Sequence, residues 1–82
     1  MNVELITPER NVFAGEASRV NLPGIDGLFE ILNNHAPLIS ALKQGPVKIT
    51  TQSAVKTINI TGGFAEVLNN NVIVVAESAK EL

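Results

Sequence analysis

The single histidine of the sequence, His35, is the only side chain that titrates near neutral pH without a perturbed environment. With Glu30 and Ser40 in the same stretch, it supplies the residue types of a hydrolytic triad, in which a base activates a hydroxyl nucleophile. No Gly-x-Ser-x-Gly turn is present to expose such a serine, so we expect no catalytic site. Two roles for His35 remain: it bonds the turn at residues 33–37, or it lies at an interface with a partner.

The glycine pairs and the lysines predict no cofactor site. The segments Gly24-Ile25-Asp26-Gly27 and Gly62-Gly63 lack the Lys-Ser/Thr and the helix start of a phosphate-binding loop. They predict tight turns, and the second predicts a bulge or a corner where a strand bends. Lys43 and Lys56 lie in sequences unlike the hairpin of a lipoyl or biotinyl carrier. Without cysteine and with one histidine, we expect no metal site and no cofactor.

Charge and hydropathy argue against two further classes. The 6 Lys and Arg, against 8 Asp and Glu, are scattered from Arg10 to Lys80 among only 3 Phe. Nucleic-acid binding is not expected, because it needs a basic stripe with interleaved aromatics. The longest apolar run, residues 72–76, is far shorter than the ~20 residues that span a bilayer, and the first residues carry no basic signal-peptide region. We expect a cytosolic location with no membrane segment.

The elements that must position these residues are β-strands. The 82 residues include 9 Val, 8 Ile and 5 Thr, only 17% are charged, and turn residues recur at short intervals. This predicts one all-β domain over residues 1–82, a flattened antiparallel sandwich or barrel of short strands. The expected strands are residues 3–7, 10–13, 17–22, 28–32, 38–42, 47–51, 55–61, 64–68 and 72–77, of which 38–42 is a strand or a single helical turn.

Two of the connections predict hairpins. Residues 47–51 and 55–61 are expected to pair, and so are residues 64–68 and 72–77, across three asparagines that tolerate left-handed backbone conformations. Residues 72–76 are apolar at every position, so we expect this strand to be covered on both faces. Residues 77–82 are polar and mildly helix-permissive, but they are too few for a stable helix.

Five motifs occur in an order that resembles one known family, the amino-terminal domain of the epsilon subunit of F-type ATP synthases. The resemblance extends from Leu5 to Ala79. Its motifs are Thr7-Pro8-Glu9 with Phe13-Ala14-Gly15-Glu16, Pro23-Gly24-Ile25-Asp26-Gly27 with Asn34-His35-Ala36-Pro37-Leu38, Leu42-Lys43-Gln44-Gly45 with Val47-Lys48-Ile49, Gly62-Gly63-Phe64-Ala65-Glu66-Val67, and Asn71-Val72-Ile73-Val74-Val75-Ala76.

The resemblance implies a fold of about ten short strands and a non-catalytic role in the rotating central stalk of a proton-translocating ATP synthase. It implies contacts with the gamma subunit and with the polar loops of the c-ring, an indirect link to the catalytic alpha/beta hexamer, and a peripheral place on the cytoplasmic face of the bacterial inner membrane. By position, it assigns c-ring contacts to Gly24, Asp26, Gly27, Leu28 and Glu30, and gamma contacts to His35 and Leu38.

The sequence departs from the family in two short segments. The family usually has an acidic residue directly after the turn glycine, where this chain has Leu28 and Phe29 before Glu30. Leu28 and Glu30 point to the same side of an extended strand, so Glu30 either replaces the acidic contact or is a solvated carboxylate. Asn33-Asn34 stand where the family often has Pro-Gly, and both pairs form turns.

Many family members continue into two antiparallel helices, and these 82 residues stop where those helices begin. We therefore expect the chain neither to bind ATP nor to inhibit hydrolysis through an extending arm. The main alternative is a free-standing β-sandwich module that binds a ligand or a peptide along a sheet edge. A chain of this size without disulfides is only marginally stable alone, which favours a subunit with a permanent partner.

Overall fold

The computed structural model describes all 82 residues as ten strands, and it has no helix long and apolar enough to cross a membrane. The all-β prediction is confirmed, and each of the nine expected strands is present. The strands are β1 (Asn2–Ile6), β2 (Asn11–Glu16), β3 (Arg19–Gly24), β4 (Gly27–Leu32), β5 (Leu38–Leu42), β6 (Gly45–Thr50), β7 (Val55–Ile60), β8 (Gly63–Leu68), β9 (Asn71–Ala76) and β10 (Ala79–Glu81).

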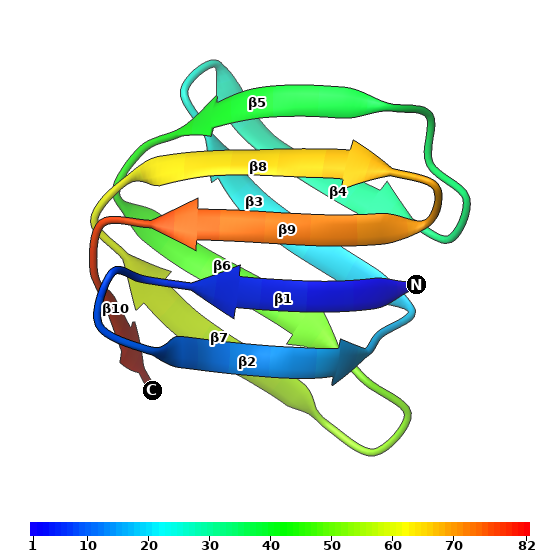
Figure 1. Cartoon of the computed structure of the whole chain (residues 1–82), viewed down its shortest axis with the longest axis horizontal. Helices are drawn as coiled ribbons and strands as arrows, with labels where there is room; N and C mark the ends of the chain where they lie inside the picture. The colour runs from blue at the N-terminus through cyan, green and yellow to red at the C-terminus, as the bar shows by residue number, and fades with distance from the viewer.

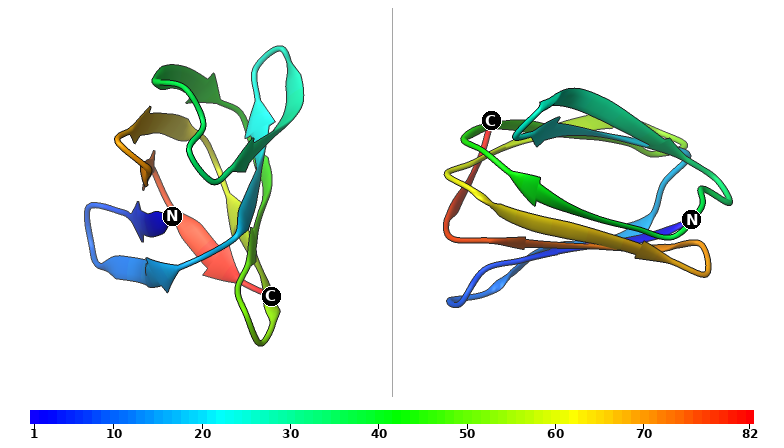
Figure 2. Two further views of the ribbon diagram at one scale, coloured as in Figure 1. Left: turned by 90° about the vertical axis from the view of Figure 1, so that its right-hand side faces the viewer. Right: turned by 90° about the horizontal axis from the view of Figure 1, so that it is seen from above.

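The strands form two layers that pack face to face (Figures 1 and 2). Layer 1 has the strand order β5-β8-β9-β1-β2, and layer 2 has the order β4-β3-β6-β7-β10. The layers join at one corner, where Gly24 at the end of β3 pairs with Leu42 at the end of β5. The result is a flattened and nearly closed sandwich in which each layer has one inner and one outer face.

One strand pair departs from the antiparallel prediction. β1 lies between β9 and β2, and its pairing with β9 is parallel, with Val3 opposite Val72. Every other strand pair is antiparallel. A parallel pair needs a long crossover connection, which here is the rest of the sandwich, so no local pattern in the sequence indicates it.

The last strand was also missed by the sequence prediction. Residues 79–81, which the sequence describes as polar and mildly helix-permissive, pair antiparallel with β7, Ala79 opposite Ile60 and Glu81 opposite Ile58. The edge of β7 presents unpaired backbone N–H and C=O groups, and this short segment satisfies some of them. Three residues have no periodicity that could reveal such a strand.

The core is made by side chains that alternate inward along both layers. All 17 of its buried residues are hydrophobic, and no polar side chain is buried. In β9, Val72, Val74 and Ala76 point inward and are buried, whereas Ile73 and Val75 on the outer face are only half-buried. The prediction that both faces of this strand are covered is therefore wrong within the chain itself, because no element packs on the outer face of layer 1.

The two predicted hairpins are confirmed, and their turns have the expected chemistry. β6 pairs with β7, and β8 pairs with β9 across Asn69 (φ 51°) and Asn70 (φ 61°), which take left-handed conformations. Gly62 and Gly63 carry the chain from β7 in layer 2 to β8 in layer 1, which confirms a corner. The pairing of Gly63 with Ala76 shows no bulge, and the irregularity in register lies between Leu5 and Ile6 instead.

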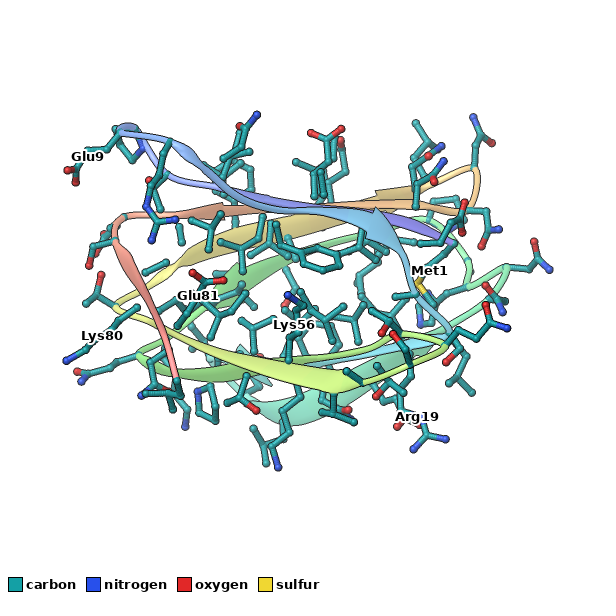
Figure 3. The ribbon with its side chains drawn as sticks, turned by 90° about the horizontal axis from the view of Figure 1, so that it is seen from below. Met1, Glu9, Arg19, Lys56, Lys80 and Glu81 are labelled. Carbon is teal, nitrogen blue, oxygen red and sulfur yellow. The ribbon has the colours of Figure 1, made fainter.

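The two layers are open along one side, where β2 and the pair β7–β10 face each other (Figure 3). Lys56 lies opposite the buried Ile49, and Glu81 lies opposite the buried Ile58, so both charged residues share the inner side of their strands at this opening. Inward-pointing charges at a sheet edge oppose the addition of a further strand from another chain.

Candidate interaction site

His35 lies in the exposed loop between β4 and β5, where it bonds the turn. Its Nδ1 is 2.7 Å from the carbonyl oxygen of Ala36, and its backbone N–H donates to the carbonyl of Leu32 over 3.2 Å. The preceding residue, Asn34, has a left-handed backbone (φ 63°) and donates its N–H to Oδ1 of Asn70 over 2.8 Å. The loop is thus fixed to the β8–β9 turn, and the turn role predicted for His35 is confirmed.

The left-handed backbone at Asn34 gives a stability prediction. We expect Asn34→Ala to lower the free energy of unfolding by about 1 kcal/mol, because a Cβ without a compensating side-chain amide disfavours this conformation. Asn34→Gly keeps the backbone conformation at little steric cost and is expected to change stability less. Urea unfolding followed by circular dichroism measures both variants, and equal midpoints for the two would contradict this account.

The three residue types of a hydrolytic triad do not come together. Glu30 is exposed on the outer face of layer 2, and Ser40 is half-buried in β5, where its hydroxyl donates to the carbonyl of Ala41 over 3.3 Å. No hydrogen bond links either residue to His35, and no three His, Asp or Glu side chains group in a way that could hold a metal ion. The structure offers no arrangement for acid–base or nucleophilic catalysis.

The β3–β4 hairpin tip brings together four of the predicted contact residues. Gly24 and Gly27 pair at its base, and Asp26 and Leu28 are exposed, Leu28 by 77%. Between the tip and β5 lies a shallow groove of about 480 Å³, also lined by Ile39 and neighbours. His35 follows the other end of β4, so the four residues at the tip and His35 lie at opposite ends of this strand (Figure 1), and Glu30 lies between them.

Glu30 already has partners within the chain. Its Oε1 accepts a hydrogen bond from Nδ2 of Asn21 (3.2 Å) and lies 3.4 Å from Nε of Arg19, on the outer face of layer 2. Leu28 and Glu30 share this face, as their spacing predicted, while Phe29 between them packs against the core. An exposed ion pair of this kind contributes little to stability, so the carboxylate remains available to a partner.

Leu38, the other residue assigned to gamma, packs against the core and is only half-exposed. Its neighbour Ile39 points the other way and is 72% exposed on the outer face of layer 1. Since side chains alternate along a strand, the outward residues of β5 are Ile39 and Ala41. Leu38 thus points to the inner side of β5, and its contact with gamma stays a prediction.

The outer face of layer 1 carries an apolar row that sequence reasoning missed. The row crosses four neighbouring strands and consists of Ala41, Phe64, Val75 and Ile6. Phe64 is 47% exposed and Val75 half-buried, and a groove of about 570 Å³ beside them extends to Pro8 and Ile25. The signal in the sequence was the apolar run at residues 72–76, whose outward members, Ile73 and Val75, lie on this face.

The sandwich brings no catalytic residues together and exposes an apolar sheet face. An exposed apolar face of this kind is typical of a subunit that functions by binding other proteins. The family model described as "ATP synthase, Delta/Epsilon chain, beta-sandwich domain" matches residues 1–82. The ATP synthase epsilon chain of Chlorobium limicola is 41% identical over 76 residues, which cover 92% of this chain and 86% of that one. The epsilon chain of Caulobacter vibrioides is 38% identical over 81 residues, which cover 99% of this chain and 94% of that one.

The fold is also found in solved structures. A chain in the cryo-EM structure of the Tetrahymena thermophila mitochondrial ATP synthase central stalk and c-ring matches with a TM-score of 0.86 and 24% identity, over 96% of this chain and 64% of that one. A chain of the Euglena gracilis mitochondrial ATP synthase matches with a TM-score of 0.90 and 18% identity, and the match covers 96% of this chain and 51% of that one.

The chain belongs to the ATP synthase delta/epsilon chain family and consists of its β-sandwich domain. The family resemblance drawn from the sequence motifs is confirmed. The epsilon chain is a non-catalytic subunit of ATP synthase.

Proposed function

We propose that this chain couples rotation of the central stalk to ion flow by holding two neighbours at once: the gamma subunit on the outer face of layer 1 and the polar loops of the c-ring at the β3–β4 hairpin tip. The observation that carries the proposal is the uncovered apolar row on layer 1. A monomer of this size gains nothing from exposing Phe64 and Ile39 to water, whereas a permanent partner would bury them.

The position of the hairpin tip supports a second contact. The tip precedes β4 and the loop with His35 follows it, and the tip exposes both Asp26 and Leu28. The tip offers the polar loops of a membrane-embedded ring one carboxylate, that of Asp26, beside the exposed apolar side chains of Ile25 and Leu28. His35, at the opposite end, is then placed for gamma or for another part of the stalk, and the catalytic alpha/beta hexamer is reached only through gamma.

The proposed site of action is peripheral, on the cytoplasmic face of the bacterial inner membrane, in a proton-translocating enzyme. The curated relatives of Chlorobium limicola and Caulobacter vibrioides are bacterial ATP synthase chains, which supports this placement. The 82 residues contain no helix, so we expect them neither to bind ATP nor to supply an extending inhibitory arm.

Cysteine crosslinking in the assembled complex tests the c-ring contact. Leu28→Cys and Glu30→Cys are expected to form disulfides with cysteines placed in the c-ring loop, because both side chains are exposed at or near the tip. Thr57→Cys is the control, on the same outer face of layer 2 but on β7, three strands from β4, and it is expected to give no product. If neither position 28 nor position 30 crosslinks while the complex is intact, the c-ring assignment is wrong.

A further inference from the structure

We propose that the partner segment on the outer face of layer 1 is a helix that lies across the strands. An apolar stripe of this helix packs on the apolar row, and two of its Lys or Arg residues, seven positions apart, form ion pairs with Glu66 and Glu4. The inference rests on the proposed function, in that this face is taken as the docking face, and it specifies the chemistry of the surface that docks there.

The apolar row sets the direction and the length of the helix. Ala41, Phe64, Val75 and Ile6 lie in register on β5, β8, β9 and β1, so the row runs across the strands. Four strands about 4.8 Å apart give a row about 14 Å long. At about 1.5 Å per residue, this matches about nine residues of helix, between two and three turns.

A second row beside the first one carries acidic residues. Two residues further along the same strands, Ile39, Glu66, Ile73 and Glu4 lie opposite one another. This acidic row is about 7 Å from the apolar row, given the rise of about 3.4 Å per strand residue. Because a helix with its side chains is about 10 Å across, residues on one flank of a helix centred on the apolar row reach Glu66 and Glu4.

Glu66 and Glu4 have no cationic partner in the chain. The ion pairs of the molecule are those of Arg19 with Glu30 and of the Met1 amino group with Glu16. Covering an unpaired carboxylate with a purely apolar partner is costly, because the charge loses its water and gains no counter-ion. A partner that covers this face therefore has to supply its own cations.

The spacing of the two carboxylates fixes the spacing of those cations. Glu66 and Glu4 lie on either side of Ile73, two strands apart, or about 9.6 Å. This is too far for one metal ion, whose oxygen ligands stand about 2.0–2.6 Å from it. Residues seven positions apart lie on the same side of a helix and about 10.5 Å along its axis, which matches the separation.

The charge contrast between the two outer faces supports the same orientation. The outward charged residues on the strands of layer 1 are all acidic, namely Glu4, Glu66 and Glu16, of which Glu16 is ion-paired with the Met1 amino group. Those of layer 2 are Arg19, Lys48, Lys80 and the ion-paired Glu30, and the Arg19 side chain points away from the sandwich in Figure 3. A basic helix is attracted to layer 1 and repelled from layer 2, which gives orientation as well as affinity.

Charge reversal tests the inference. The dissociation constant of the chain for F1 depleted of this subunit is measured for wild type, for the double variant Glu4→Lys with Glu66→Lys, and for Lys48→Glu on the other face. We expect the double variant to bind at least about 100-fold more weakly, because like charges then face each other, and Lys48→Glu to bind as wild type. The isosteric pair Glu4→Gln with Glu66→Gln is expected to weaken binding less and to reduce its dependence on salt.

The outcomes separate this inference from the proposed function. Wild-type affinity in both double variants, with the urea midpoint unchanged, would overturn the basic-helix inference but leave docking through the apolar row intact. Loss of affinity in the Gln pair with no change in salt dependence would also contradict it. A compensating change in gamma tests the pairing directly: two basic residues seven positions apart on a gamma helix are changed to glutamate. Restored binding of this gamma variant to the Lys double variant would confirm the pairing.

Discussion

Gly63→Ala is expected to lower the free energy of unfolding by about 3 kcal/mol or more, which is a large part of the stability of a domain of this size. A Cβ at this position would lie 2.0 Å from the carbonyl oxygen of Val75 and 2.9 Å from Cα of Ala76. Both neighbours are backbone atoms of β9, so they cannot move without breaking the β8–β9 pairing. The backbone φ of 147° adds strain, because L-residues with a side chain rarely adopt it.

Two other glycines separate the clash from the strain. At Gly15 a Cβ would make an ordinary 3.5 Å contact with the Phe13 ring, so Gly15→Ala is expected to change stability by less than about 0.5 kcal/mol. At Gly27 the φ is 132° but the space is open, so Gly27→Ala reports backbone strain alone, about 1–2 kcal/mol. Urea unfolding of the three variants gives the comparison. The prediction would be contradicted if the urea midpoint of Gly63→Ala were no lower than that of Gly27→Ala, because β9 would then have shifted to make room for the new methyl group.

Phe64→Asp is expected to abolish stable association with gamma while the chain remains folded. Phe64 is the largest member of the apolar row, and central aromatic residues dominate the energy of many interfaces. An aspartate there would remove that contact and bury a charge without a partner, so we expect affinity for depleted F1 to fall by at least about 100-fold. Co-purification of gamma with a tagged chain from solubilised membranes measures the effect.

The matched control for this substitution is Val55→Asp. Val55 lies on β7 in layer 2 and is 59% exposed, against 47% for Phe64. Both changes place a carboxylate on an exposed strand position, so their effects on folding are expected to be similar and small. Gamma retained by Phe64→Asp would mean that another surface holds the stalk, and equal loss in both variants would point to a folding defect.

Much of the fold was predictable because its elements are local. Residues 47–51 and 55–61, and the last hairpin with its asparagine turn, show β-branched residues in alternation and turn residues between them. The parallel pairing of β1 with β9 was not predictable in this way, because it joins Val3 to Val72 across the whole chain. β10 was not predictable either, because its three residues pair with an edge that exists only once β7 is in place.

The candidate site was predictable only in part, for a related reason. The turn at residues 24–27 and the loop around His35 can be identified from residue types, since each is a local turn. The apolar row is a property of four strands together, and none of its members stands out in its own segment. The sequence motif does not say that Ile39 rather than Leu38 faces outward on β5, because the side of each residue is known only once the register is known.

The parallel pairing of β1 with β9 has a consequence for synthesis on the ribosome. β1 is among the first residues to emerge, yet one of its two neighbours is completed only at Ala76. Until then the β1–β2 hairpin has one open edge, and the inner residues Val3 and Leu5 lack the β9 core residues Val72, Val74 and Ala76 beside them. The nascent domain therefore completes its hydrophobic core only when β9 has been made, and slow translation of residues 71–76 would prolong its exposure to chaperones and proteases.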